Sequence, residues 1–306
     1  MSDEIAVGVP VFERTEALQR CLNSIPADAV DRVIVADNGP ANAHAGIYAT
    51  EWPFTLDVLD LEYDVGIGAC RAAIADELTE EYLLVVDSDM RLPAASQLRQ
   101  LQTALDERPS LGGVSGVLLE DGQIRAGCSN LHETTTLLGR DVLVHAIREQ
   151  PAIEWVDSTI PIARFDKLTN AALVRRECLA DGAWDGEFPT DEHLDFYLGH
   201  HHQTDWEFAA CPVVQFAHEK GRYEAYRERV RERNDEKQQQ ADARYREKWG
   251  YDRIEYGCRV DWFRSSQPSL VTAGYRSLNR RLGVRWTLPL RDAVSVAGSL
   301  RRRGDA

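Results

Sequence analysis

Two aspartates one residue apart, Asp87 and Asp89, follow a run of apolar residues at 82–86. Such a run predicts a buried strand, and side chains at positions i and i+2 of a strand point to the same side. If the strand continues past Ser88, the two carboxylates converge and repel, so a positive charge must neutralise them. Mg²⁺ and Mn²⁺ prefer carboxylate oxygens and are often shared with a substrate phosphate. The triplet therefore indicates a metal site, with a solvated turn at Ser88 as the alternative.

The composition restricts the class of protein. The 306 residues suffice for one large α/β domain with appendages. No apolar run of about 18 residues occurs, and the N-terminus lacks an apolar signal segment, so we expect neither a membrane span nor secretion. Six cysteines lie far apart without a C-x-x-C pair, which disfavours a zinc ribbon or a disulfide framework. These features predict a cytoplasmic protein.

The charge is strongly acidic and lysine-poor: the net charge is −15, and four lysines stand against 31 arginines. This balance is typical of proteins that work in molar salt, where screening removes self-repulsion, and it predicts a haloarchaeal source. It also disfavours nucleic acid as a partner. Residues 271–306 differ, with eight arginines and two aspartates. For this tail, a helix with a solvated basic end and peripheral docking on an anionic membrane both remain open.

Strand and helix patterns alternate over the first 90 residues. We expect strands at 5–11, 32–37, 54–61 and 82–86, and helices from Thr15 and at 71–78. This alternation predicts a mainly parallel sheet with helices on both faces. Further elements are expected at 96–108 (helix), 113–119 (strand), 191–198 (helix start) and 211–217 (strand). Residues 120–165 are hard to assign, and strands and loops that cover a site are one interpretation of them. The charged run 223–249 predicts a long exposed helix with ion pairs along it.

Four short motifs follow the four predicted strands: PVFER from Pro10, DNG from Asp37, DVGIG from Asp64 and DSD from Asp87. In this order they resemble the family 2 type glycosyltransferases of the GT-A fold, which carry P-x-[YF]-x-R, an acid, N-x-G-x-x-x-A-R and D-x-D. The resemblance covers about residues 5–220. It implies an α/β fold of the GT-A type, with a single Rossmann-like sheet and a C-terminal helical extension.

The expected organisation is a GT-A domain over 1–220, a charged helical extension over 221–270 and a basic amphipathic tail over 271–306. By the resemblance, Phe12 would lie near the base of a nucleotide-diphosphate sugar, and Asp37 would accept a hydrogen bond from the base or ribose. Gly66 would let the backbone approach the nucleotide without a Cβ. The full set implied to bind the nucleotide is Pro10, Phe12, Arg14, Asp37, Asn38, Gly66, Arg71, Asp87 and Ser88.

The resemblance also implies a metal, Mn²⁺ or Mg²⁺, held by Asp87, Asp89 and His218. Asp89 would bind the ion directly, whereas Asp87 would contact ribose or metal-bound water. His218 ends a predicted strand, and its neutral imidazole would suit Mn²⁺, with a structural histidine as the alternative. The metal would stabilise the diphosphate leaving group. Arg71 would oppose negative charge on the sugar-nucleotide or pair with Asp87.

A second acidic cluster lies in the stretch "WDGEFPTDEHLDFYL" at 184–198. Members of the family carry an acidic motif, commonly Glu-Asp, at a helix start after an acceptor loop that contains W-D. Here His193 takes the second place of that motif. An inverting transfer needs a carboxylate that removes the proton of the acceptor hydroxyl. Glu192 is the first candidate, Asp191 and Asp195 are alternates, and His193 would act if no carboxylate serves. Capping of the helix N-terminus is the structural alternative for these acids.

The sequence thus predicts a metal-dependent inverting glycosyltransferase, with a UDP-sugar favoured as donor and a glycan or dolichol-phosphate-linked glycan as acceptor. By analogy, a haloarchaeal source would place it in surface-layer glycoprotein assembly at the cytoplasmic face of the membrane. A sugar nucleotidyltransferase is one alternative, although the glycine-rich basic loop it needs is missing from "VGVPVFERTE" at 7–16. The other is an inactive carbohydrate-binding or scaffold protein, which would have lost the acids that this chain retains.

Overall fold

The computed structural model describes residues 5–120, 122–125, 127–147, 149–219 and 230–256. The chain divides into two compact units. The larger unit contains the described residues of 5–128, 152–219 and 230–241, and the smaller unit contains those of 129–151 and 242–256. The predicted basic tail, 271–306, lies outside the described residues, and the domain boundaries predicted at 220 and 270 stay predictions.

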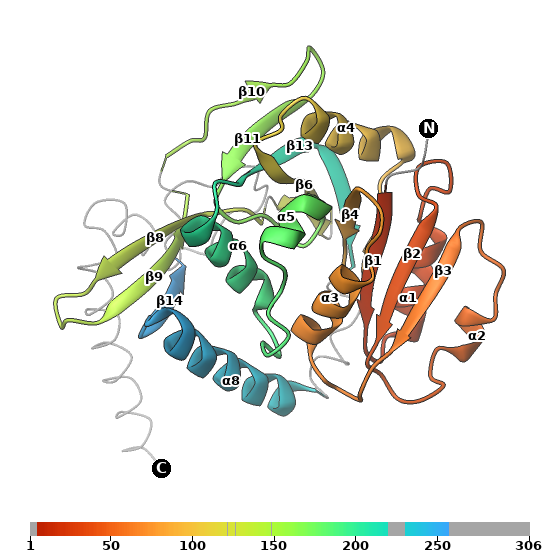
Figure 1. Cartoon of the computed structure of the whole chain (residues 1–306), viewed down its shortest axis with the longest axis horizontal. Helices are drawn as coiled ribbons and strands as arrows, with labels where there is room; N and C mark the ends of the chain where they lie inside the picture. Colours follow the sequence, from red (N-terminus) through yellow and green to blue (C-terminus); the bar gives the residue numbers. More distant parts are fainter. Residues whose placement is uncertain (1–4, 121, 126, 148, 220–229, 257–306) are drawn as a thin grey trace. The chain divides into compact units, whose positions relative to one another are not determined.

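One long sheet forms the centre of the larger unit (Figure 1). Its strand order is β10-β11-β13-β6-β12-β4-β1-β2-β3, and the short β5 and β7 pair with β13 and β6. The neighbours β4, β1, β2 and β3 are parallel, as are β6 and β13, whereas β12 runs antiparallel between β4 and β6. The bounds are β1 (Ile5–Val11), β2 (Arg32–Asp37), β3 (Thr55–Asp60), β4 (Tyr82–Val85), β5 (Met90–Arg91), β6 (Leu111–Glu120), β7 (Gln123–Arg125), β10 (Glu154–Trp155), β11 (Pro161–Phe165), β12 (Ala172–Arg175) and β13 (Glu207–His218).

Helices cover both faces of this sheet, which confirms the predicted α/β architecture. Val7 and Val9 of β1 share a buried cluster with Leu18 of α1 and Leu101 of α4. Gly8 points to the opposite face, because neighbouring strand residues alternate, and a Cβ added there would lie 2.7 Å from Ile74 of α3. Figure 1 shows α1 behind the strands and α3 in front. The helices are α1 (Thr15–Asn23), α2 (Ala45–Tyr48), α3 (Ile67–Asp76), α4 (Ala95–Asp106), α5 (Arg176–Asp181), α6 (Glu192–Gln203) and α8 (Arg231–Trp249).

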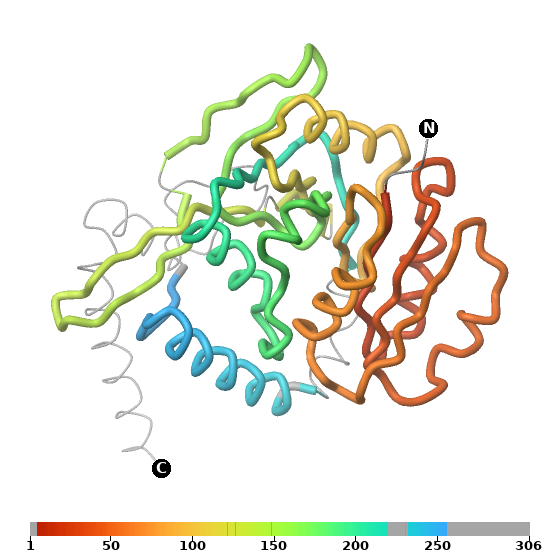
Figure 2. Tube along the Cα trace, in the orientation of Figure 1, coloured from red at the N-terminus to blue at the C-terminus, as the bar shows by residue number. Residues whose placement is uncertain are grey.

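The smaller unit contains a three-stranded sheet in the order β14-β9-β8. Its strands β8 (Asn130–Thr135) and β9 (Asp141–Ala146) form an antiparallel hairpin, which is easily followed in the trace (Figure 2), and β14 (Arg253–Tyr256) runs parallel to β9. Val142, Val144 and Ala146 on β9 are buried. None of the described helices has the length and apolar character needed to cross a membrane. The five described cysteines form no disulfide with one another.

One predicted helix begins earlier than expected, and one stretch that is hard to assign from the sequence contains short strands. The helix expected from Arg71 begins already at Ile67, because Gly66 adopts a φ of 107° that ends the preceding loop. The stretch 120–165, which is hard to assign from the sequence, contains β7 to β11 in short pieces. Such short strands depend on pairing with distant partners more than on local periodicity.

The close contact between the loops after β1 and β2 gives a stability prediction. A Cβ added at Gly39 would lie 1.8 Å from the carbonyl oxygen of Phe12. We expect Gly39→Ala to lower the free energy of unfolding by about 1–3 kcal/mol, because the two loops must move apart. Gly46→Ala is the matched control: Gly46 lies in α2 with nothing within 4 Å of the added Cβ, so its effect should be neutral or stabilising. Urea denaturation measures both, and equal effects would contradict the prediction.

Candidate functional site

The loops after β1, β2 and β3 meet at one edge of the sheet. The backbone N–H of Asn38 donates a hydrogen bond of 3.0 Å to the carbonyl of Val11. The N–H of Asp64 donates one of 2.8 Å to the carbonyl of Asn38. These bonds tie three consecutive strand ends together. In open α/β sheets, ligands bind in the crevice outside the carboxyl ends of the strands.

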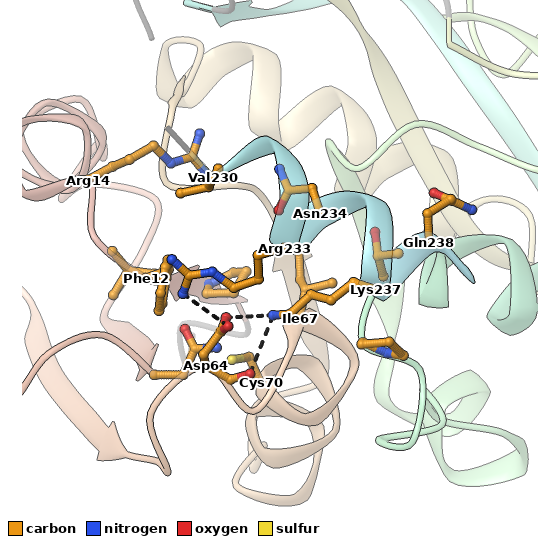
Figure 3. A pocket seen from close by; sticks show the side chains of 15 residues that line it. Phe12, Arg14, Asp64, Ile67, Cys70, Val230, Arg233, Asn234, Lys237 and Gln238 are labelled. Atoms are coloured by element: carbon orange, nitrogen blue, oxygen red, sulfur yellow. Dashed lines mark hydrogen bonds and ion pairs between the residues drawn. The ribbon is translucent and has the colours of Figure 1, made fainter. Parts of the chain in front are cut away.

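A cavity of about 310 Å³ lies at this edge (Figure 3). Its wall carries three cations, Arg14, Arg233 and Lys237, and one carboxylate, Asp64, whereas the whole chain has a net charge of −15. A positive cavity in an acidic protein attracts an anionic ligand. The lining residues come from the three strand ends, α3, the segment before α6 and the first turns of α8: Pro10, Val11, Phe12, Arg14, Asn38, Asp64, Ile67, Cys70, Pro189, Thr190, Val230, Arg233, Asn234, Lys237 and Gln238.

Of the residues that the sequence assigned to a nucleotide, Pro10, Phe12, Arg14 and Asn38 line this cavity. The Phe12 ring lies 5.4 Å from that of Tyr63, measured between centroids. An aromatic face next to cationic side chains is the pattern of a site for a base joined to phosphates.

Asp37 lies behind the cavity wall, and neighbouring groups already bind its carboxylate. Its Oδ1 accepts a hydrogen bond from the Gly39 N–H (2.9 Å), while Oδ2 lies 2.6 Å from the Tyr48 hydroxyl and 2.8 Å from His44 Nδ1. Burial opposes ionisation, yet the bonds from His44 and Tyr48 hold the pKa of Asp37 below its usual value. In this structure Asp37 therefore holds the loop after β2 in place, and its contact with a nucleotide stays a prediction.

Gly66 makes a close backbone approach, but to protein. A Cβ added there would lie 2.8 Å from Cα of Pro189, and the N–H of Gly68 donates to the carbonyl of Phe188. The glycine is therefore needed to bring the start of α3 against the segment before α6. A nucleotide contact of Gly66 stays a prediction.

The chain turns at Ser88, so Asp87 and Asp89 do not face the same partners. The N–H of Met90 donates to the carbonyl of Asp87 over 3.0 Å, which closes a tight turn. Asp87 accepts hydrogen bonds from Arg71 and Asn170, each 2.8 Å long. Ser88 is fully buried, and its hydroxyl has no hydrogen-bond partner within the described residues.

Asp89 instead meets Arg14 and His218. Arg14 Nη1 donates to Asp89 Oδ2, and His218 Nε2 lies 3.6 Å from the same oxygen. Burial opposes ionisation of Asp89, but His218 and Arg14 lower its pKa to about 2. The other ring nitrogen of His218 lies 2.7 Å from Glu120 Oε1. This carboxylate–histidine–carboxylate chain ties the end of β13 to the loop after β4.

The donor set partly fits a divalent metal. A carboxylate oxygen and an imidazole nitrogen that face each other suit Mn²⁺, and Glu120 would orient the imidazole as an outer partner. Asp87 is held by Arg71 and Asn170, so only Asp89 and His218 of the predicted ligands lie together. Among the described residues, no group of three or more His, Cys, Asp or Glu side chains could by itself hold a metal. The remaining ligands would have to come from a bound phosphate or water.

Arg71 is the buried centre of the site, with a relative exposure of 1%. Its Nη2 donates a hydrogen bond to Asp87. Its Nε lies 2.8 Å from a carboxylate oxygen of Glu192, and this contact is an ion pair without hydrogen-bond geometry. Its Nη1 lies 3.4 Å from Nδ1 of His193. Burial raises the pKa of Glu192 while Arg71 opposes that shift, and burial together with Arg71 lowers the pKa of His193 well below its usual value. The pairing of Arg71 with Asp87, one of its two expected roles, is thus present.

The four candidates for the general base differ in accessibility. Glu192, His193 and Asp195 are 3%, 6% and 3% exposed, whereas Asp191 is exposed. Asp191 precedes α6 in the left-handed conformation, with φ 59°, and its Oδ2 accepts a hydrogen bond from Gln238 over 2.7 Å. A strained non-glycine residue held by its surroundings is a frequent mark of a functional site.

The contribution of α8 to this cavity was not predicted from the sequence pattern. The described part of the charged run is helical, as predicted. Arg233 and Lys237, however, form ion pairs with Asp64 and not along the helix, so the prediction of a solvated face is wrong for these two residues. The signal in the sequence that could have indicated this is spacing. Arg233, Lys237 and the fully buried Ala241 lie four residues apart and therefore share one face of the helix.

Removal of Arg71 gives a pH-dependent stability prediction. Arg71→Met leaves Glu192 buried without its counter-charge, which should cost about 3–5 kcal/mol of the free energy of unfolding at pH 8. A buried carboxyl whose pKa is raised in the folded state gains stability as the pH falls, so the deficit should shrink between pH 8 and pH 5. Urea denaturation at each pH measures it. The double variant Arg71→Met/Glu192→Gln should lose most of this pH dependence; a pH-independent deficit in the single variant would contradict the prediction.

Comparison with known proteins gives one family match. Residues 6–129 match the model of glycosyl transferase family 2. This segment contains β1 to β4 and the loops that carry Phe12, Asn38, Asp64 and Asp89. A comparison with curated proteins finds no match.

Solved structures give matches of low sequence identity. GalNAc-T7, solved with UDP, GalNAc and Mn²⁺, is 12% identical over 70% of this chain and 43% of that chain, with a TM-score of 0.51. TarS 1-349 from S. aureus is 16% identical over 71% of this chain, with a TM-score of 0.48. This chain covers 60% of that TarS chain, so it spans less than two thirds of these proteins. Residues 6–129 are thus similar to glycosyl transferase family 2, and the mixed sheet covered by helices gives the chain the GT-A fold.

Proposed function

We propose that this protein is a metal-dependent inverting glycosyltransferase that moves a sugar from a UDP-sugar to a hydroxyl group of a glycan or lipid-linked glycan. The observation that carries the proposal is the positively charged cavity at the strand ends of the domain at 6–129. Four residues expected to bind the donor, Pro10, Phe12, Arg14 and Asn38, line it. GalNAc-T7, which has a similar fold, was solved with UDP and Mn²⁺, and this supports the choice of donor and ion.

The donor would lie with its base near Phe12 and Tyr63 and its diphosphate toward the cations of the cavity. Asp89 and His218 would hold Mn²⁺ or Mg²⁺, which supplies charge stabilisation to the leaving diphosphate when bound. Metal binding needs a neutral imidazole, so the proton that Asp89 and Glu120 favour on His218 would have to leave. Arg14 would then be released from Asp89 and could face a phosphate.

Asp191 is our choice for the general base. It is the exposed member of the acidic cluster, and its partner Gln238 and its neighbour Thr190 both line the cavity. Asp191 would accept the proton of the acceptor hydroxyl as the oxygen attacks the anomeric carbon from the side opposite the diphosphate. Glu192 is better suited to positioning, because Arg71 binds it in the interior.

The proposed cellular location and process rest on composition and analogy. A net charge of −15 with four lysines supports a protein of high-salt cytoplasm, and a lipid-linked acceptor would place it at the cytoplasmic face of the membrane. Assembly of a surface-layer glycan is the corresponding process. An inactive carbohydrate-binding protein with the same fold is the second candidate.

The donor and the metal are tested together by thermal shift in molar KCl. UDP, GDP, dTDP and CMP are added with and without Mn²⁺ to the wild type and to Asp89→Asn. We expect UDP to raise the melting temperature of the wild type only with Mn²⁺, since a ligand at 100 times its dissociation constant adds about 2.7 kcal/mol. Asp89→Asn should lose the shift. If no nucleotide shifts the melting temperature of the wild type, the hypothesis of an inactive carbohydrate-binding protein replaces our proposal.

The base assignment predicts a kinetic effect. Asp191→Asn should lower kcat for UDP release from the UDP-sugar by about 100-fold or more, because it removes the proton acceptor. Asparagine tolerates the left-handed conformation at φ 59°, so the melting temperature and the KM for donor should change little. An unchanged kcat would move the base elsewhere in the cluster. Glu192→Gln serves as the comparison, and we expect it to act mainly through stability.

A further inference from the structure

The start of α8 brings two cations onto a single carboxylate at the cavity. Arg233 Nη1 lies 3.1 Å from Asp64 Oδ2, and Lys237 Nζ lies 2.5 Å from Asp64 Oδ1. Figure 3 shows both side chains reaching from the helix toward Asp64. Asp64 itself adopts the left-handed conformation, with φ 59°, which costs energy for a residue other than glycine. The strained loop after β3 therefore holds its carboxylate up to the helix.

This arrangement leaves more positive charge than Asp64 neutralises. The third cation of the wall, Arg14, pairs with Asp89. The guanidinium of Arg233 also lies 5.0 Å from the centre of the Phe12 ring, where the base of the donor is expected. Arg233 and Lys237 are 34% and 19% exposed, so solvent screens them only in part. Two long, flexible side chains one helical turn apart can turn to a ligand without movement of the helix.

We propose that Arg233 and Lys237 bind the diphosphate of the donor and stabilise it as it leaves, with Asp64 holding both cations in place until the donor arrives. This inference rests on the proposed function and adds to it a pair of residues outside the domain at 6–129. The phosphate oxygens replace the Asp64 carboxylate as acceptors. As the bond between sugar and diphosphate breaks, negative charge grows on the diphosphate, and two nearby cations stabilise that charge.

The affinity for UDP compared with that for uridine tests the proposal, because only the diphosphate should depend on the two cations. Arg233→Gln and Lys237→Gln should each weaken UDP binding about tenfold, as expected for loss of one charge-assisted contact, and leave uridine binding within about twofold. Isothermal titration at one fixed KCl concentration, with Mn²⁺ present, measures both ligands. Arg99→Gln is the matched control: it removes a 57% exposed arginine on α4 and should change neither affinity.

Asp64→Asn gives a change of opposite sign that misfolding cannot imitate. Asparagine tolerates the conformation of Asp64 but lacks its charge, so the cations no longer have to leave a carboxylate. UDP should bind about threefold or more tightly, with uridine unchanged. Weaker UDP binding in Asp64→Asn, or equal losses of UDP and uridine in the cation variants, would show that the three residues only hold the helix and would overturn the proposal.

A wild type that binds UDP, together with cation variants that bind it equally well, would overturn this inference and leave the proposed function intact. A wild type that binds neither UDP nor uridine would overturn both. The two failures are therefore distinguished by the wild-type titration alone.

Discussion

The site depends on one buried positive charge, the guanidinium of Arg71. A cation with 1% exposure persists in a protein interior only if carboxylates compensate it, and here Asp87 and Glu192 do so. Asp87 follows β4, and Glu192 opens α6, so the ion pairs join the centre of the sheet to the helix that directly follows Asp191. The need to neutralise Arg71 thereby holds the loop after β4 and the start of α6 next to each other.

The same need explains why the acids of the site have different partners. Asp87 and Glu192 are tied to Arg71 and are suited to holding the structure. Asp89 and Asp191 have partners at the rim of the cavity and could exchange them for a ligand: Asp89 contacts Arg14, and Asp191 contacts Gln238. Acids that are close in the sequence thus have different partners, because their side chains point to different surroundings.

The cavity also shows how an acidic chain can present a positive site. Its three cations come from the loop after β1 and from α8, which are distant in sequence. Local charge, more than the net charge of −15, sets the potential that a ligand meets. Arg233 and Lys237 come from a highly charged run, 223–249, in which most of the polar side chains that the structure describes are exposed.

The sequence by itself determined the alternation of strands and helices, and with it the edge where Phe12, Asn38, Asp64 and Asp89 meet. Those features follow from apolar periodicity and from the rule that parallel strands end at the same edge. Only the tertiary structure decided that Asp87 and Asp89 face apart, and that α8 reaches the cavity. The turn at Ser88 and the pairing of Arg233 with Asp64 depend on contacts between segments far apart in the chain, which local patterns do not encode.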